Sequence, residues 1–207
     1  MRLKDTTSHW RPRVAGVLPA ARAAALACGL TVSILFGLFS PHLSDAADSR
    51  VDQVKAAFVL NIIRFVAWPA ESFRDPAAPL LLCLYRSNPH GRAMLELEGQ
   101  IASDRAVSVR TISALADSQN CQILLIDDSE LAEYSTETPI QAARPLLTIL
   151  DMTEREQTEI TRPNVMISLV RKATRMGFEI NLDKVRQAGL RMSSELLKLA
   201  TIVENGG

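Results

Sequence analysis

The sequence predicts an α/β protein with a single-domain, open and largely parallel β-sheet flanked by helices. Short apolar segments of strand length, without polar alternation, follow one another along the chain and are separated by segments of helical character. A strand that is apolar on both sides must be covered on both faces. Alternation of such strands with helices is typical of a parallel sheet between helical layers.

The N-terminal segment, residues 1–46, has the pattern of a signal peptide. Basic residues precede an apolar run at residues 23–39, and Pro41 breaks this run before small residues that suit cleavage in front of Ala47. An uncleaved membrane anchor is the alternative, because the run approaches the length of a spanning helix. In both cases the positive charges stay inside, so we expect residues 47–207 to lie in the periplasm.

Residues 47–207 have the length of one domain with its own core. Their charge is slightly negative, and they contain neither a basic stripe nor an aromatic platform. Binding to nucleic acid is therefore not expected.

The elements of this domain follow from its apolar pattern. Residues 51–67 predict a helix that is apolar on most sides, ended by Trp68-Pro69 because proline disfavours a helical residue before it. We further expect strands at residues 80–85, 107–111, 121–126, 146–150, 165–170 and 178–182. Shorter helices are expected at residues 91–97, after residue 129, from 183 to 189, and from 193 or 194 to 203.

Three aspartates, Asp127, Asp128 and Asp151, follow predicted strands. The first two resemble the acidic pair of a response-regulator receiver domain, which holds a magnesium ion. Asp151 comes too soon after Asp127 for the strand and helix of a receiver, and an exported domain has no access to cytoplasmic phosphodonors. We therefore expect capping and turn roles for these side chains.

Cys83 and Cys121 are the only cysteines after residue 46. An even number of cysteines in an exported domain is compatible with a disulfide. The alternative is that both are buried thiols that pack as small apolar side chains.

The residues of the domain give no catalytic or metal-binding constellation. His90 is its only histidine, so neither a closed zinc site nor a catalytic triad can be assembled. Ser193 and Ser194 have no nucleophile-elbow sequence around them and are predicted to cap the last helix. We expect no enzyme activity, no metal and no cofactor.

Asn61 and Arg64 form a narrow polar strip on the first helix. Arg64 favours the C-terminus of a helix, and Asn61 can satisfy a neighbouring backbone group. The alternative is that they contact a partner or a small anion. Arg191 has the same two interpretations.

Several segments together resemble the YfiR-like family of periplasmic regulatory proteins. The first helix carries Lys55-Ala56-Ala57-Phe58, Asn61, Arg64-Phe65-Val66 and Trp68-Pro69 in the family's order. The later matches, also in order, are Leu82-Cys83-Leu84, Cys121-Gln122-Ile123-Leu124, Leu147-Thr148-Ile149-Leu150-Asp151, Phe178-Glu179-Ile180-Asn181-Leu182 and the segment 189–200. The resemblance covers essentially all of residues 47–207.

The resemblance implies a non-enzymatic regulator that binds and restrains an inner-membrane signalling protein. The first candidate partner is a diguanylate cyclase, which would connect the protein to cyclic di-GMP and biofilm formation. A periplasmic small-molecule binding protein that serves a sensor kinase or a transporter is the alternative, and a homodimer is compatible with both. Thr161-Arg162-Pro163-Asn164 replaces the family's glycine-rich turn, and a second cysteine pair of some relatives is absent.

Overall fold

The computed structural model describes most of the chain from residue 43 onward. The described residues are 43–86, 88, 91–137, 144–155, 162, 164–173 and 175–203. Residues 1–42, which include most of the predicted leader, and His90 lie outside them.

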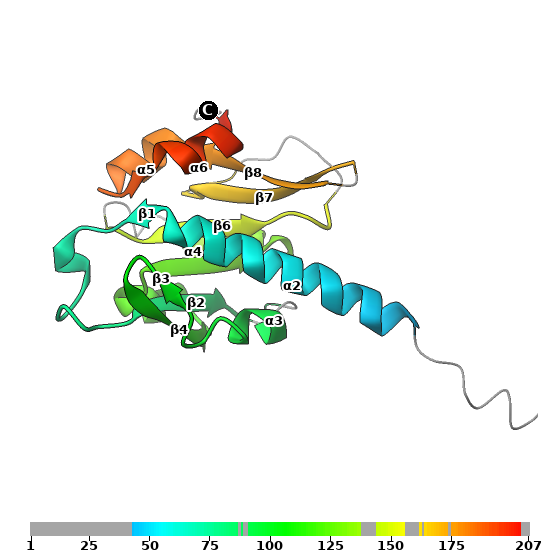
Figure 1. Cartoon of the computed structure of the whole chain (residues 1–207), viewed down its shortest axis with the longest axis horizontal. Coiled ribbons are helices and arrows are strands. Elements are labelled where there is room, and N and C mark those ends of the chain that lie inside the picture. Colours follow the sequence, from blue (N-terminus) through cyan, green and yellow to red (C-terminus); the bar gives the residue numbers. More distant parts are fainter. Residues whose placement is uncertain are drawn as a thin grey trace, which may run out of the picture. The chain divides into compact units, whose positions relative to one another are not determined.

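The described elements form one large sheet, one small ribbon and several helices (Figure 1). The strands are β1 (Val66–Ala67), β2 (Leu80–Tyr85), β3 (Ile101–Ala102), β4 (Arg105–Ile112), β5 (Ile123–Asp127), β6 (Leu147–Asp151), β7 (Ile167–Lys172), β8 (Arg175–Asn181), β9 (Arg191–Met192) and β10 (Thr201–Val203). The helices are α2 (Leu43–Arg64), α3 (Gly91–Leu95), α4 (Leu131–Glu137), α5 (Leu182–Gln187) and α6 (Ser194–Leu199), with short 3₁₀ turns η1 (Ala70–Ser72), η2 (Leu115–Asn120) and η3 (Asp128–Glu130).

The large sheet has eight strands in the order β10-β8-β7-β6-β5-β2-β4-β3. Five of the neighbouring pairs are parallel, and the pairs β7–β8 and β3–β4 are antiparallel. Every residue of β5 and of β6 is buried. The predicted α/β fold with a largely parallel sheet is therefore confirmed. The strands lack polar alternation because they are covered on both faces.

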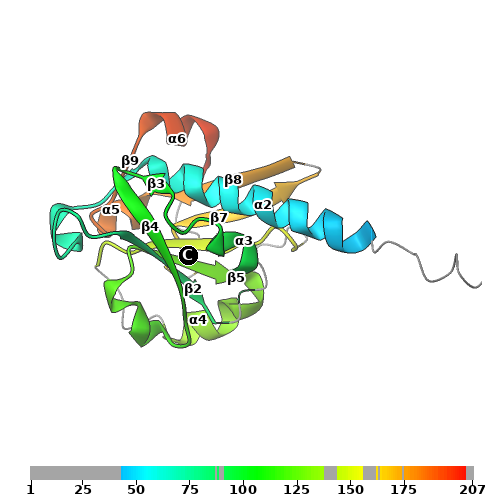
Figure 2. The ribbon, with the colours of Figure 1, turned by 60° about the horizontal axis from the view of Figure 1, so that its bottom comes forward.

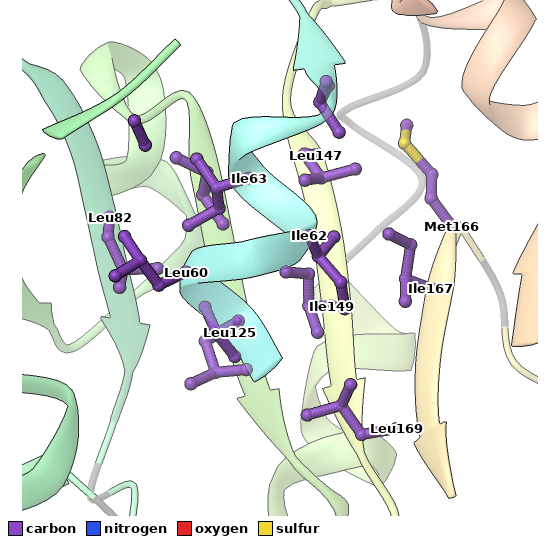
Figure 3. Close-up of a cluster of buried hydrophobic side chains, with 14 of the residues drawn as sticks. Leu60, Ile62, Ile63, Leu82, Leu125, Leu147, Ile149, Met166, Ile167 and Leu169 are labelled. Carbon is purple, nitrogen blue, oxygen red and sulfur yellow. The ribbon is translucent and has the colours of Figure 1, made fainter. Parts of the chain in front are cut away.

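One face of the sheet packs against α2 (Figure 3). Leu60, Ile62 and Ile63 of α2 lie over Leu82, Leu125, Leu147, Ile149, Ile167 and Leu169 of the sheet, and all of these side chains are buried. Residues of the segment 185–196 from α5 and α6 belong to the same cluster. Burial of such large apolar side chains stabilises the fold by about 1.5–3 kcal/mol each.

The opposite face packs against η2 and α4, so that the sheet lies between two helical layers (Figure 2). Leu124 and Ile126 of β5 point to this side, in alternation with the residues that face α2. They contact a cluster that contains Leu115, Leu131 and Tyr134.

The predicted first helix is wrong at its C-terminal end. Helix α2 ends at Arg64, and Val66–Ala67 form β1, which pairs antiparallel with β9. The apolar character of Val66 reflects burial in the core, which a strand residue achieves as well as a helical one. The helix is also less enclosed than predicted, since Val54 is 46% exposed.

The predicted last helix is too long as well. Helix α6 ends at Leu199, and Thr201–Val203 form β10, which pairs in parallel with β8. Threonine, isoleucine and valine are β-branched and favour strands. An available edge of β8 therefore determines the conformation of these three residues.

Lys55 is fully buried within α2, although lysine is rarely found without solvent contact. Its Nζ atom lies 3.2 Å from Asp151 Oδ2 and 3.2 Å from Glu154 Oε1. The Asp151 carboxylate is buried at the end of β6, whereas Glu154 is exposed and also pairs with Arg171. This ion pair joins α2 to the carboxyl end of the central strands.

Replacing Lys55 with alanine should lower the free energy of unfolding by about 3–5 kcal/mol, because Asp151 would remain as a buried carboxylate without its cation. Urea unfolding measures the change. Arg50→Ala, at an exposed position of the same helix, is the control and should stay within about 0.5 kcal/mol of the wild type. The double variant K55M/D151N should recover part of the loss, because neither charge remains. Equal stabilities of K55A and R50A would contradict the structural role of the pair.

Candidate functional site

The C-terminal end of α2 presents Arg64 at the surface. Its Nε donates to the carbonyl of Ile101 at 3.2 Å, and its Nη1 donates to Asn61 Oδ1 at 3.2 Å. Asn61 and Arg64 both lie on the exposed side of the helix. Asn61 therefore orients the Arg64 guanidinium, and Arg64 ties the helix to β3.

The turn between β3 and β4 is hydrogen-bonded to the C-terminal end of α2. Ser103 and Asp104 both have positive φ angles, of 48° and 60°, which are found in tight hairpin turns. The Ser103 hydroxyl oxygen lies 3.0 Å from the carbonyl oxygens of both Ile63 and Val66, which share its single hydrogen as acceptors. The carbonyl of Ile63 is one of those that the end of α2 leaves open, and the carbonyl of Val66 belongs to β1.

The ribbon of β1 and β9 brings a distant arginine to the same place. Arg191 is the register partner of Ala67, and the backbone N–H of Ser193 donates to the carbonyl of Phe65 at 3.0 Å. Gly189 allows the chain to turn from α5 into β9, because its φ angle of 72° lies in the region that favours glycine.

A third arginine is held by the loop before β2. The Arg105 guanidinium carbon lies 3.6 Å from the centroid of the Phe73 ring, a cation–π arrangement, and its Nη1 donates to the carbonyl of Ala78 at 2.5 Å. Two fixed contacts thus restrict this side chain.

Gln122 connects Trp68 and η1 to the sheet through hydrogen bonds. Its backbone carbonyl accepts a hydrogen bond from Trp68 Nε1 at 3.2 Å. Its side chain accepts from the Leu81 N–H at 2.9 Å and donates to the carbonyl of Ser72 at 2.8 Å. Because Gln122 itself is buried, the positions of Trp68 and of η1 are well defined.

These segments enclose a surface cavity of about 680 Å³, within the range of ligand sites. We call it the arginine groove and define it by Arg64, Arg105, Arg191, Phe65, Trp68 and Phe73. Asp104 is the only acidic side chain among the described residues that line it, and these residues therefore carry excess positive charge. Fixed guanidinium groups beside aromatic rings suit a ligand that combines carboxylates or phosphates with apolar groups.

A second cavity of about 480 Å³ shares Phe73 with the arginine groove. Arg74 and Arg110 line it together with Glu71. Both arginines are oriented, since Arg74 Nη2 donates to Asn120 Oδ1 at 2.9 Å and Arg110 Nη2 donates to the carbonyl of Asp117 at 2.9 Å.

The structure brings together two of the three residues that the sequence suggested as partner- or ligand-binding. Arg64 and Arg191 line the arginine groove, and Asn61 contacts Arg64 without lining the cavity. Sequence reasoning missed Arg105 and Phe73. The Ser103-Asp104 turn before a strand was an available signal for Arg105, because a hairpin at that point would carry the arginine next to the end of the first helix.

The two cavities lie at the amino ends of parallel strands. Arg105, which lines the arginine groove, begins β4, and Ala78 and Gln122, which line the second cavity, precede β2 and β5. The crevice expected for a solute-binding protein lies at the carboxyl ends. At that edge the structure has the Lys55–Asp151 pair and local turns.

Two of the three strand-end aspartates, Asp127 and Asp151, have the predicted turn and capping roles. The prediction is wrong for Asp128, whose carboxylate accepts from Arg155 Nε at 2.7 Å in an ion pair. Asp127 Oδ1 accepts from the Ser129 N–H at 3.0 Å and caps η3. Asp151 Oδ1 accepts from the Thr153 N–H at 3.0 Å. Among the described residues, no group of three or more His, Cys, Asp or Glu side chains could hold a metal ion.

Cys83 and Cys121 form a disulfide, with 5.9 Å between their Cα atoms. The bond joins β2 to the residue that leads into the neighbouring strand β5, inside the cluster beneath η2 and α4. Arg110 Nη2 lies 3.8 Å from Cys121 Sγ.

Ser193 is the cap of α6, because its hydroxyl oxygen accepts from the Leu196 N–H at 3.2 Å. Ser194 is the first helical residue and not the cap. Glu195 accepts hydrogen bonds from its own backbone N–H and from the Ser193 hydroxyl, and these bonds lower the pKa of its carboxyl.

The fold and the groove define a mixed α/β domain with a cationic, aromatic surface site. The chain belongs to the YfiR/HmsC-like family, whose model matches residues 52–201. Members of this family are periplasmic regulators. No curated protein matches the sequence. In the part of the chain that the structure describes, no helix has the length and apolar composition needed to cross a membrane.

The disulfide predicts the labelling of both cysteines. In protein that is unfolded without reductant, alkylation should leave Cys83 and Cys121 unlabelled, and prior reduction should expose both. Peptide mapping by mass spectrometry checks each site separately. The double variant C83A/C121A should lose up to about 4 kcal/mol of stability, since the bond closes a loop of 38 residues. Two labelled thiols in the unreduced protein would contradict the bond.

The two adjacent serines should differ in their effect on stability. Ser193→Ala removes the capping oxygen and should lower the free energy of unfolding by about 1 kcal/mol. Ser194→Ala is the matched control and should change it by less than about 0.5 kcal/mol. Urea unfolding of the two variants gives the comparison. A larger loss for S194A than for S193A would show that the cap is assigned to the wrong serine.

Proposed function

We propose that this protein is a non-enzymatic regulator of the periplasm that binds and restrains an inner-membrane signalling protein. Membership in the YfiR/HmsC-like family carries this proposal. A diguanylate cyclase is the proposed partner, so that binding lowers cyclic di-GMP output and biofilm formation. Residues 1–46 would direct the chain to the periplasm, as a cleaved leader or as an anchor.

The arginine groove supports binding as the mode of action. Arg64 and Arg105, which are held by fixed contacts, and Arg191 line the groove together with Trp68 and Phe73. Tryptophan and arginine are enriched among the residues that dominate binding energy. A regulator that holds its target in one state needs a higher affinity for that state than for the other. The groove supplies contacts through which such a difference in affinity can arise.

Deletion of the gene should raise cyclic di-GMP and surface attachment in the native host, because the cyclase loses its restraint. Mass-spectrometric quantification of cyclic di-GMP measures the effect. A plasmid copy of the wild-type gene should restore the original level, and a copy without residues 1–46 should not, since it stays in the cytoplasm. Unchanged cyclic di-GMP in the deletion strain would contradict the proposed target.

A second candidate function is that of a small-molecule binding protein for a membrane sensor kinase or transporter. The specific observation in its favour is the size of the arginine groove, which is that of a ligand site. Saturable binding of citrate or benzoate to the purified protein, together with unchanged cyclic di-GMP in the deletion strain, would favour this function over the first.

A further inference from the structure

We propose that the arginine groove and the cavity next to it receive an acidic segment of the partner protein that also carries an apolar or aromatic side chain. This inference rests on the proposed function, and it specifies the chemistry of the partner where that function names only its class. Three observations support it. They are the excess positive charge of the groove, the contacts that orient its arginines, and the extension of the surface over two adjacent cavities.

The charge of the two cavities is strongly unbalanced. Of the described residues, three arginines and one aspartate line the first cavity, and two arginines and one glutamate line the second. Cations gathered in a depression of the surface repel one another and raise the local potential, which attracts anionic groups. A carboxylate bound between them relieves this repulsion and can accept paired hydrogen bonds from a guanidinium.

The arginines retain donor groups for a ligand. Arg64 uses Nε and Nη1 for Ile101 and Asn61, and Arg105 uses Nη1 for backbone carbonyls before β2. Within the described residues their Nη2 groups have no partner, and Arg191 has none for its whole side chain. Two of the three guanidinium groups are therefore fixed in place while one edge stays available, which lowers the entropic cost of binding.

Apolar contacts accompany these donors. Phe65 is 40% exposed at the rim of the groove, and Ile101, whose carbonyl holds Arg64, is 59% exposed. Trp68 and Phe73 are partly buried and form the wall. A purely ionic ligand would leave these rings in water. The surface therefore suits a ligand in which carboxylates lie next to an apolar side chain.

The extent of the surface favours a polypeptide over a small molecule. Phe73 lines both cavities, and each cavity alone is large enough for a small ligand. Arginines line both of these cavities. An extended chain with several acidic side chains can occupy both cavities at once, whereas one small anion would engage only one of them.

Charge reversal tests this proposal with the full-length protein in cells of its native host. The protein is isolated after chemical cross-linking in cells, and the co-isolated cyclase is quantified by mass spectrometry. Arg191→Glu should reduce the recovered cyclase by about tenfold or more, because like charges across an interface cost several kcal/mol. R191K should retain most of it. Arg92→Glu and Arg175→Glu, at exposed positions outside both cavities, are the matched controls and should behave like the wild type.

A photo-cross-linker identifies the bound segment. With p-benzoylphenylalanine in place of Phe65, the cross-linked partner peptide should contain an excess of aspartate and glutamate and at least one aromatic or large aliphatic residue. The same group in place of Leu199, which is 73% exposed on α6 outside the groove, should not label this peptide. The amount of partner protein recovered should fall as the salt concentration is raised, because the charges of the groove are accessible to ions.

The outcomes separate the inference from the proposed function. If the wild-type protein recovers no inner-membrane signalling protein, the proposed function fails and the inference fails with it. If the cyclase is recovered equally by wild type and R191E, or if the cross-linked peptide is neutral or basic, only the inference is overturned. Cross-linking from position 65 to a second copy of this chain would likewise overturn it. Circular dichroism and urea unfolding of R191E verify that the variant is folded.

Discussion

The packing of α2 against one face of the parallel sheet is the interaction on which the rest of the structure depends. Leu60, Ile62 and Ile63 of the helix cover the side chains of β2, β5, β6 and β7 on that face (Figure 3). The path of the helix fixes where it ends, and its end is one wall of the arginine groove. That position also determines where Arg64 lies, which carbonyls Ser103 reaches and where β1 starts.

The two ends of the sheet differ in whether their charged side chains are compensated by opposite charges. At the carboxyl ends, Lys55 and Asp151 are buried and neutralise one another. At the amino ends, arginines are exposed or half-buried, and few acidic residues lie near them. A buried ion pair is inert toward ligands because its charges are already compensated, whereas uncompensated cations on an accessible surface attract anions. Binding is therefore expected at the amino ends.

The fold was largely predictable because the sheet is apolar on both faces. The runs around Leu82, Leu124 and Ile149 have no polar alternation, and this pattern arises when both sides of a strand are buried. The ends of the helices were not predictable in this way. Val66 and Ile202 fit the helical pattern, yet both belong to strands whose partners, β9 and β8, lie far away in the sequence.

The candidate site was predicted in part, because two of its arginines lie in segments with a local signal. Arg64 interrupts an apolar helix face, and Arg191 follows a glycine that ends a helix. Phe73 has no such signal, and the signal for Arg105 was indirect, since it lay in the Ser103-Asp104 turn that precedes this arginine. Lys55 shares a helix face with Val59 and Ile62 although it is charged.

The sequence by itself determined the α/β class, the strand-rich core, the turn roles of Asp127 and Asp151 and the family of this protein. The first three properties depend on residues that are close together in the chain, because periodicity, capping and apolar runs are local. The family follows from the order of such segments along residues 52–201. The tertiary structure alone decided that Arg64, Arg105 and Arg191 line one groove, and that Lys55 meets Asp151. These side chains come from separate elements, and only the packing of α2, the β1–β9 ribbon and the β3–β4 turn brings them together.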